Sequence, residues 1–222
     1  GIRQAVADDL NRRFQAGVRP QNLFFTCGAA PALIAVLRAL AVPDSEVIGF
    51  DYRAQTPWEA KEEFTHFFAE KRRRCDGLTL IANSIGAFFS MMSLDAAYVD
   101  RAYLISPVVD MEKLIGNMLL WANVTERELE EKQEIPTDFG ETLSWRYLCY
   151  VREHPVIWHV PTRILYGEHD DLTSIETISS FAKRNGAELT VMPGGEHWFH
   201  TEEQMQFLNH WIRECNAKNV CC

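Results

Sequence analysis

A serine, an aspartate and a histidine, far apart in the sequence, have side chains that together could carry out nucleophilic catalysis: Ser84, Asp170 and His197. A serine hydroxyl attacks a carbonyl carbon only when a base removes its proton. A histidine held by a carboxylate can be that base, because the carboxylate fixes its tautomer and stabilises the imidazolium. We therefore expect Ser84 to be the nucleophile, His197 the general base and Asp170 the orienting acid.

The sequence around Ser84 predicts a sharp turn from a strand into a helix. An apolar run at 78–82 has the length of a strand, and an apolar run of helical length follows the serine. Small residues two positions before and after the serine, Ala82 and Gly86, let the backbone turn without side-chain clashes. Such a turn lifts the hydroxyl above the edge of the sheet, where a substrate can reach it.

The candidate acid and base also follow predicted strands. Asp170 comes after the strand 163–166, and His197 comes after the strand 188–192 and a glycine-containing loop. Ligands of open parallel sheets bind outside the carboxyl ends of the strands, so all three side chains are expected at one edge.

Each of these two residues has a neighbour that spacing alone does not separate from it. Asp171 is the alternative acid and His200 the alternative base. The competing structural interpretations are that Asp170 caps the following helix and that His197 is an ordinary loop histidine. Separate structural explanations for Ser84, Asp170 and His197, each at the end of a strand and in this chain order, are weaker than the explanation by one triad.

Composition limits the class of protein. The 222 residues are 47% hydrophobic, which fits a single globular domain over 1–222. The net charge of −9 argues against a general nucleic-acid binder, and no apolar run is long enough to span a membrane. The first residues lack the apolar core of a signal peptide, and the six cysteines show no metal-binding spacing. We expect a cytoplasmic protein with reduced thiols that acts on a small molecule, and its oligomeric state stays open.

Strands and helices alternate along most of the chain, which predicts a three-layer α/β/α fold around a mostly parallel sheet. Six strands are expected, at 22–27, 47–50, 78–82, 102–105, 163–166 and 188–192. Helices are expected at 2–15, 29–40, 58–74, 84 onward, 174–185 and 202–216. Residues 110–155 interrupt the alternation as a helical insertion without an early strand, either a lid over the serine or an outer helical layer. Its position between two strands favours the lid.

From about residue 46 onward the chain resembles the α/β-hydrolases of the serine esterase or lipase-like type. The motifs that carry the resemblance are Ala82-Asn83-Ser84-Ile85-Gly86, Gly167-Glu168-His169-Asp170 and Gly195-Glu196-His197. The chain order serine, aspartate, histidine is also that of this family. Ala82 replaces the usual first glycine, and a His-Gly loop before the first helix is absent.

Residues 2–43 resemble instead a fragment of a fold-type I, pyridoxal-phosphate-dependent aminotransferase, on the motif Asn22-Leu23-Phe24-Phe25-Thr26-Cys27-Gly28-Ala29-Ala30. The remainder of an aminotransferase is missing, and no motif offers a Schiff-base lysine. We therefore expect no cofactor and interpret the chain as a possible chimera whose first segment supplies a strand and helices to the same sheet.

The resemblance implies a serine hydrolase that acts on small ester or acyl substrates through an acyl-enzyme. Its oxyanion hole would use the backbone N–H of Ile85 and a second donor near Cys27 and Gly28. Two alternatives stay open. One is a chimeric scaffold with an impaired or vestigial hydrolase site, and the other is a phosphate- or cofactor-binding module built on the Gly28 turn.

Overall fold

The computed structural model describes residues 47–217 of the chain. The chain divides into two compact units, Gly1–Asp51 and Tyr52–Cys222, and the fold below is that of the second unit. The predicted strand at 22–27, its neighbouring helices, the aminotransferase-like segment and the oxyanion candidates Cys27 and Gly28 lie outside the described residues.

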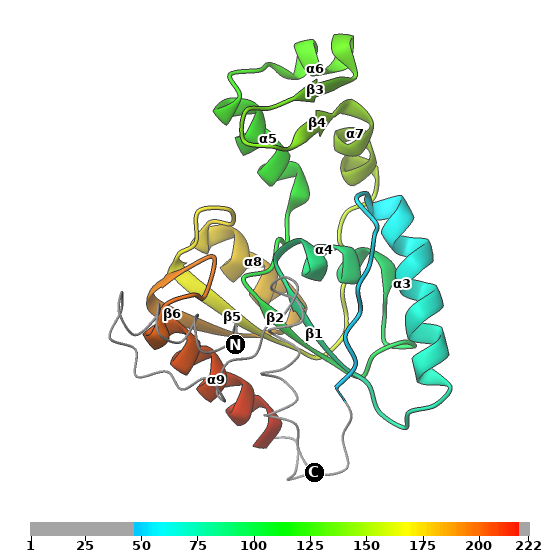
Figure 1. Cartoon of the computed structure of the whole chain (residues 1–222), viewed down its shortest axis with the longest axis vertical. Helices are drawn as coiled ribbons and strands as arrows, with labels where there is room; N and C mark the ends of the chain where they lie inside the picture. The colour runs from blue at the N-terminus through cyan, green and yellow to red at the C-terminus, as the bar shows by residue number, and fades with distance from the viewer. Residues whose placement is uncertain (1–46, 218–222) are drawn as a thin grey trace, which may run out of the picture. The chain divides into compact units, whose positions relative to one another are not determined.

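A four-stranded parallel sheet forms the centre of this unit (Figure 1). Its strands are β1 (Thr79–Asn83), β2 (Arg101–Ile105), β5 (Thr162–His169) and β6 (Glu188–Glu196), in the spatial order β1-β2-β5-β6. The register aligns the carboxyl ends of the first three strands, because Asn83 pairs with Ile105 and Ile105 pairs with Leu165. Parallel strands that are buried on both faces have nearly continuous apolar sequences, so the sequence predicted these four strands clearly.

Helices cover both faces of the sheet. Right-handed crossovers place α4 (Ser84–Ser93) and α8 (Ile175–Asn185) on one face, with α3 (Pro57–Arg72) packed against α4. The last helix, α9 (Glu202–Ala217), covers the opposite face, where the hydroxyl of Tyr103 donates to the carbonyl of Cys215 at 3.0 Å. The described residues therefore form the three-layer α/β/α fold expected from the sequence.

The helices begin and end at residues whose side chains or backbone favour those positions. Thr56 and Glu59 form a capping box at the start of α3. Ser174 caps α8, and Gly186 ends it in the left-handed conformation with a φ of +64°. The apolar faces of these helices supply the core together with the central strands, where Leu104 and Ile164 are completely buried.

The segment from Met111 to Glu153 departs from the all-helical prediction. It contains α5 (Met111–Trp121), α6 (Glu126–Lys132) and α7 (Trp145–Glu153), and between the last two a short antiparallel hairpin of β3 (Glu134–Pro136) and β4 (Thr142–Ser144). The expectation of no strand before residue 147 was therefore wrong. Three-residue strands are too short to show alternation, and the intervening turn at Thr137–Gly140 was not recognised.

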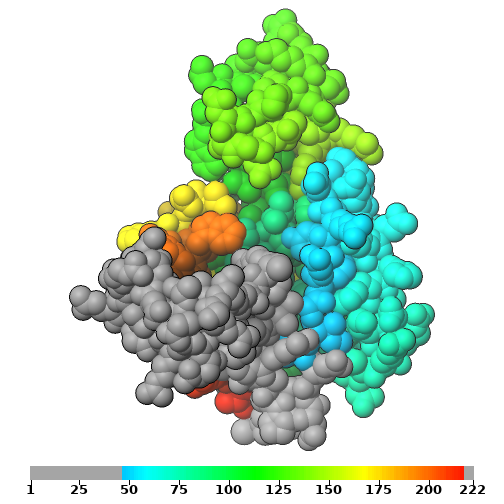
Figure 2. Space-filling model, viewed as in Figure 1, coloured from blue at the N-terminus to red at the C-terminus, as the bar shows by residue number. Residues whose placement is uncertain are grey.

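Exposed polar contacts join the helices of this α5–α7 segment, around buried side chains such as Leu129, Leu143 and Leu148. The guanidinium of Arg152 in α7 donates to Glu126 in α6, at 2.7 and 2.9 Å, and to Glu112 in α5 at 2.7 Å. Aromatic rings connect it to α3, because Trp58 contacts Tyr147 and Tyr150 edge-on. Figure 2 shows the segment, in green, beside the residues that lead into α3, in cyan.

Two strand predictions also need correction. Residues 47–50 have no regular secondary structure, although their composition is that of a strand. Apolar and β-branched composition gives only a tendency to form a strand and does not by itself fix one. The second correction concerns length: β5 continues beyond Tyr166 to His169, and β6 continues beyond Met192 through both glycines to Glu196. The expected glycine loop before His197 is therefore part of a strand.

Candidate active site

Ser84 is the first residue of α4 and directly follows β1. Its φ of +50° lies in the left-handed region, which residues other than glycine rarely adopt. Strain of this kind costs about 1–3 kcal/mol and persists where the surroundings impose it. The amide of Asn83 donates to the carbonyl of Ile105 at 3.0 Å, and the backbone N–H of Val108 donates to the carbonyl of Ser84 at 3.2 Å. Both bonds connect the turn to the end of β2.

The residue two positions after the serine, Gly86, lies against Tyr52. A Cβ at Gly86 would lie 3.4 Å from the hydroxyl oxygen of Tyr52, which is an ordinary van der Waals contact. The predicted turn at Ser84 agrees with its observed geometry, whereas the role predicted for Gly86 stays a prediction.

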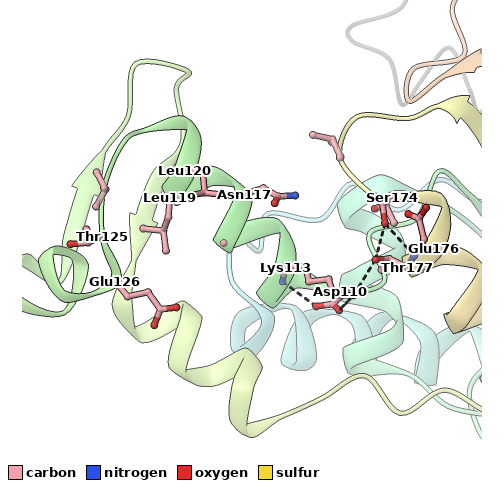
Figure 3. A pocket seen from close by; sticks show the side chains of 14 residues that line it. Asp110, Lys113, Asn117, Leu119, Leu120, Thr125, Glu126, Ser174, Glu176 and Thr177 are labelled. Carbon is pink, nitrogen blue, oxygen red and sulfur yellow. Dashed lines mark hydrogen bonds and ion pairs between the residues drawn. The ribbon is translucent and has the colours of Figure 1, made fainter.

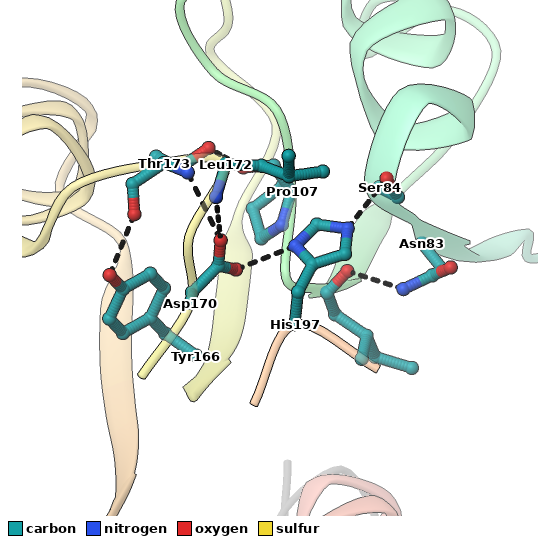
Figure 4. A network of polar contacts seen from close by, with 9 residues as sticks. Asn83, Ser84, Pro107, Tyr166, Asp170, Leu172, Thr173 and His197 are labelled. Atoms are coloured by element: carbon teal, nitrogen blue, oxygen red, sulfur yellow. Dashed lines mark hydrogen bonds and ion pairs between the residues drawn. The ribbon is translucent and has the colours of Figure 1, made fainter. Parts of the chain in front are cut away.

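A continuous line of hydrogen bonds joins the three candidate residues (Figure 4). The Oγ of Ser84 lies 2.9 Å from Nε2 of His197, and Nδ1 of the same ring lies 2.8 Å from Oδ2 of Asp170. An ionised carboxylate can only accept, so Nδ1 carries the ring proton and Nε2 is left to accept from the serine hydroxyl. The side chains of His197 and Asp170 are 2% and 0% exposed, which keeps water away from the bond between them.

The second carboxylate oxygen of Asp170 is fixed by the loop that follows it. The backbone N–H groups of Leu172 and Thr173 donate to Oδ1 at 2.9 and 3.0 Å. The loop is held in turn by the hydroxyl of Tyr166, which donates to the carbonyl of Thr173 at 2.7 Å. Burial, with a smaller contribution from the charge of Asp170, raises the pKa of Tyr166 to about 12. The tyrosine therefore keeps its proton, and its hydrogen bond, throughout the physiological pH range.

Close contact between β5 and β6 brings His197 to this acid. A Cβ at Gly167 would lie 2.5 Å from the carbonyl oxygen of Glu196, so only glycine fits there. The register shifts between Gly167 and His169, which is a β-bulge, and Gly194 has a φ of +65°. His169 pairs with Glu196 beyond the bulge, and His197 follows directly. The glycines of the sequence motif thus shape a bulge and a close strand contact.

The structure distinguishes the pairs of neighbours that the sequence left open. Asp170 and His197 face each other and Ser84, whereas Asp171 and His200 are exposed. The Nδ1 of His200 lies 3.3 Å from a carboxylate oxygen of Glu196 and takes no part in the line of bonds.

Sequence reasoning missed Tyr166 and Thr173 as supporting residues, and it named Gly167 only as part of a motif. One signal was available: an aspartate side chain often accepts from backbone N–H groups two and three residues later, as Asp170 does here. No comparable local signal identifies Tyr166, because its partner depends on how the loop folds back over the strand.

Of the three expected oxyanion donors, only Ile85 lies within the described residues. Its N–H belongs to the first turn of α4, where helical N–H groups have no acceptor within the helix. This group therefore points out of the helix N-terminus beside the serine and is available to a negatively charged oxygen.

Two clefts adjoin the line of bonds. The larger, of about 740 Å³, lies between α5 and the start of α8, and includes Leu172 and Thr173 of the acid loop (Figure 3). Across it the Nζ of Lys113 donates to the hydroxyl of Thr177 at 3.2 Å. The smaller, of about 300 Å³, is lined by residues that end or follow β5 and β6, and His197 is one of them.

The described residues offer no arrangement of three or more histidine, cysteine or acidic side chains that could hold a metal ion. None of the helices within 47–217 combines the length and apolar character needed to cross a membrane.

Comparison with known proteins supports the fold through structure. No protein-family model and no curated protein matches the sequence, so the aminotransferase-like resemblance of residues 2–43 gains no support. Among solved structures, Est1E from Butyrivibrio proteoclasticus superposes with a TM-score of 0.60 at 14% identity, over 76% of this chain and 72% of its own. Alpha/beta hydrolase domain-containing protein 10 from mouse gives 0.58 at 15% identity, over 73% and 70% of the two chains. The esterase domain of a Rhodothermus marinus protein gives 0.56 at 14% identity, over 85% and 80%.

These similarities, together with the parallel sheet and the layer arrangement, establish that the described part of the chain has the α/β-hydrolase fold. Identities of this size show the fold alone, and the chemistry has to be argued from the site.

Proposed function

We propose that this protein is a serine hydrolase that cleaves small ester or acyl substrates through an acyl-enzyme formed on Ser84. The observation that carries the proposal is the buried line of bonds from Ser84 to His197 to Asp170, with distances of 2.9 and 2.8 Å. Distances of this size let a proton pass from the hydroxyl to the imidazole as the nucleophile attacks.

In the first half of the reaction Oγ of Ser84 bonds to the carbonyl carbon of the ester while its proton moves to Nε2 of His197. The negative charge that develops on the carbonyl oxygen is stabilised by the N–H of Ile85, and one such donor contributes about 2.7–4 kcal/mol to the transition state. The bond to the alcohol oxygen then breaks, and Nε2 returns the proton to that oxygen. The acyl group remains on the serine.

In the second half a water molecule replaces the alcohol. His197 takes one proton from the water as its oxygen bonds to the acyl carbon, and then returns that proton to Oγ of Ser84 as the acyl–serine bond breaks. Asp170 stays ionised throughout and stabilises the imidazolium through Nδ1–H. The buried position of this pair strengthens the interaction, because few water molecules screen it.

The decisive experiment is labelling with a fluorophosphonate, which phosphonylates an activated serine. Intact mass should rise by one adduct in the natural sequence, and peptide mapping should place the adduct on Ser84. The Ser84→Ala variant should not react, while Ser90→Ala, which removes a serine from the same helix, should react normally. Equal labelling of the natural sequence and Ser84→Ala would reject the proposal.

Substrate tests separate a working enzyme from a chimeric scaffold with an impaired site. Est1E from Butyrivibrio proteoclasticus has been solved with ferulic acid bound, so a methyl ester of that acid belongs among the substrates, beside p-nitrophenyl acetate. Turnover that is lost in Ser84→Ala supports the hydrolase. Labelling of Ser84 without turnover of any ester would indicate a reactive serine whose oxyanion hole is incomplete.

A further inference from the structure

The smaller cleft beside the proposed catalytic histidine has an unusual set of lining groups. It measures about 300 Å³, near the lower limit for small-molecule sites, and is formed by His169, Asp171, Glu196, His197, Trp198 and His200. Two of these residues follow or end β5, and the others end or follow β6. The β5–β6 bulge therefore shapes this cleft as well as positioning His197.

The charge of this cleft is negative. Asp171 and Glu196 are exposed acidic residues, and neither lysine nor arginine occurs among its described lining residues. The Nδ1 of His200 lies 3.3 Å from a carboxylate oxygen of Glu196. A histidine balances the charge of a carboxylate only while it is protonated. Carboxylates alone do not make a site, but here they share a cavity with an aromatic ring and with a group of the proposed mechanism.

That ring is Trp198, which is 63% exposed although tryptophan is usually well buried. It meets the His197 ring at 83° with the centroids 5.4 Å apart, and its large indole surface is otherwise open to solvent. An indole face attracts cations through its quadrupole, best among the aromatic side chains, and alkylammonium groups are bound in this way. An exposed indole that shares a cleft with two carboxylates is a recognisable cation-binding combination.

We propose that this cleft is a subsite for an alkylammonium group in the leaving part of the substrate. The inference rests on the proposed function, because His197 must protonate the leaving oxygen and so has the leaving part beside it. The preferred substrate class is then an ester of a cationic amino alcohol. The positive group would lie against Trp198 and near Asp171 and Glu196.

Binding to the Ser84→Ala variant tests the subsite without needing turnover. Choline and its neutral isostere, 3,3-dimethyl-1-butanol, are titrated separately at pH 8 and low salt, by calorimetry or indole fluorescence. Choline should saturate with a Kd at least about tenfold lower than that of the alcohol, the size expected for a cation on an aromatic face with nearby carboxylates. Equal affinity for both, or no saturation by choline, would overturn the proposal.

Matched variants identify the groups responsible. In the Ser84→Ala background, Asp171→Asn with Glu196→Gln should weaken choline binding about tenfold, and Trp198→Leu should do so separately. The control, Glu203→Gln with Glu214→Gln in α9, removes the same net charge from exposed positions that do not line the cleft and should leave the affinity unchanged. Equal weakening by the control pair would mean that the net charge alone explains the effect, and would overturn the proposed subsite.

Kinetics with the natural sequence distinguish this inference from the proposed function. Acetylcholine should be cleaved with a kcat/KM at least about tenfold above that of 3,3-dimethylbutyl acetate. If neither ester is cleaved and Ser84 is not labelled by the fluorophosphonate, but choline binds selectively, the cleft is a cation site and the hydrolase proposal fails. If both are cleaved equally and choline shows no binding preference, the hydrolase stands and the subsite fails.

Discussion

The bonds that hold Asp170 and His197 differ in kind from those that hold the α5–α7 segment. The acid and base are fixed by buried hydrogen bonds and by a strand contact that leaves no room for a side chain at Gly167. In the α5–α7 segment, beside buried side chains such as Leu129 and Leu148, the helices are joined by ion pairs in which Arg152 is 35% and Glu126 51% exposed. Buried bonds with unique geometry fix atoms to within fractions of an ångström, whereas exposed ion pairs contribute little and exchange with water.

The contrast suggests a division of tasks between the two regions. The sheet edge around β5 and β6 holds the geometry that the proposed proton transfer requires, whereas the polar contacts between α5, α6 and α7 are exposed. The interpretation of that segment as a lid stays a prediction. The experiments below test the contrast itself, beginning with the largest expected effect.

Loss of the orienting carboxylate should affect turnover most. Asp170→Asn keeps the size of the side chain but lets it donate to Nδ1, which favours the wrong histidine tautomer, so kcat should fall about ten-thousandfold. The comparison variant is Asp138→Asn, an exposed aspartate between β3 and β4, whose kcat should stay within about twofold. Steady-state kinetics with p-nitrophenyl acetate measure both. A similar loss in the two variants would remove Asp170 from its proposed role.

A methyl group at the contact between β5 and β6 should also reduce activity strongly, because it disturbs the structure that positions His197. Gly167→Ala places a Cβ against the backbone of Gly195 and Glu196, and overpacking of this kind should lower the free energy of unfolding by about 3 kcal/mol. Fluorophosphonate labelling should slow as well, because His197 moves with β6.

The control variant is Gly116→Ala in α5, where nothing lies within 4 Å of the added Cβ. That change should raise the stability by up to about 1 kcal/mol, as measured by urea unfolding.

The buried tyrosine should have a smaller effect that depends on pH. Tyr166→Phe removes the bond to the carbonyl of Thr173 and should cost about 1 kcal/mol at pH 7. Because folding raises the pKa of Tyr166 to about 12 from the usual value near 10, its contribution is complete below pH 10 and declines as the pH rises toward 12. The stability difference between the natural sequence and the variant should therefore shrink over this range. A difference that stays constant from pH 8 to 12 would contradict the argument.

The ion pairs of the α5–α7 segment should contribute least. Arg152→Ala should change the free energy of unfolding by less than about 1 kcal/mol, and the change should diminish at high salt. The hydrogen bond from Arg152 lowers the pKa of Glu126, so the pair is intact above the usual carboxylate range and weakens as the pH falls through the lowered pKa. The protection factors of α6, which correct for the slower intrinsic exchange of amides in acid, should therefore fall with pH in the natural sequence but not further in the variant. Protection that is high and independent of pH in both would mean that this segment is as firmly held as β5 and β6.

The sequence predicted those parts of the site whose signals are local. The strand, small residues and helix around Ser84 identify a turn without any tertiary information, and the positive φ agrees with it. It could not separate Asp170 from Asp171, because both follow the same strand and only the loop at Leu172 and Thr173 selects one. The β3–β4 hairpin was missed because three-residue strands carry no periodicity.

The backbone of Ser84 has a consequence for evolution. Glycine would adopt a φ of +50° without strain, so Ser84→Gly should fold at least as stably as the natural chain. Selection for stability alone would therefore favour replacing a residue that the proposed chemistry requires. A lineage that did not need that chemistry would gain stability by losing this serine. The proposed function would account for a serine that is kept at this position.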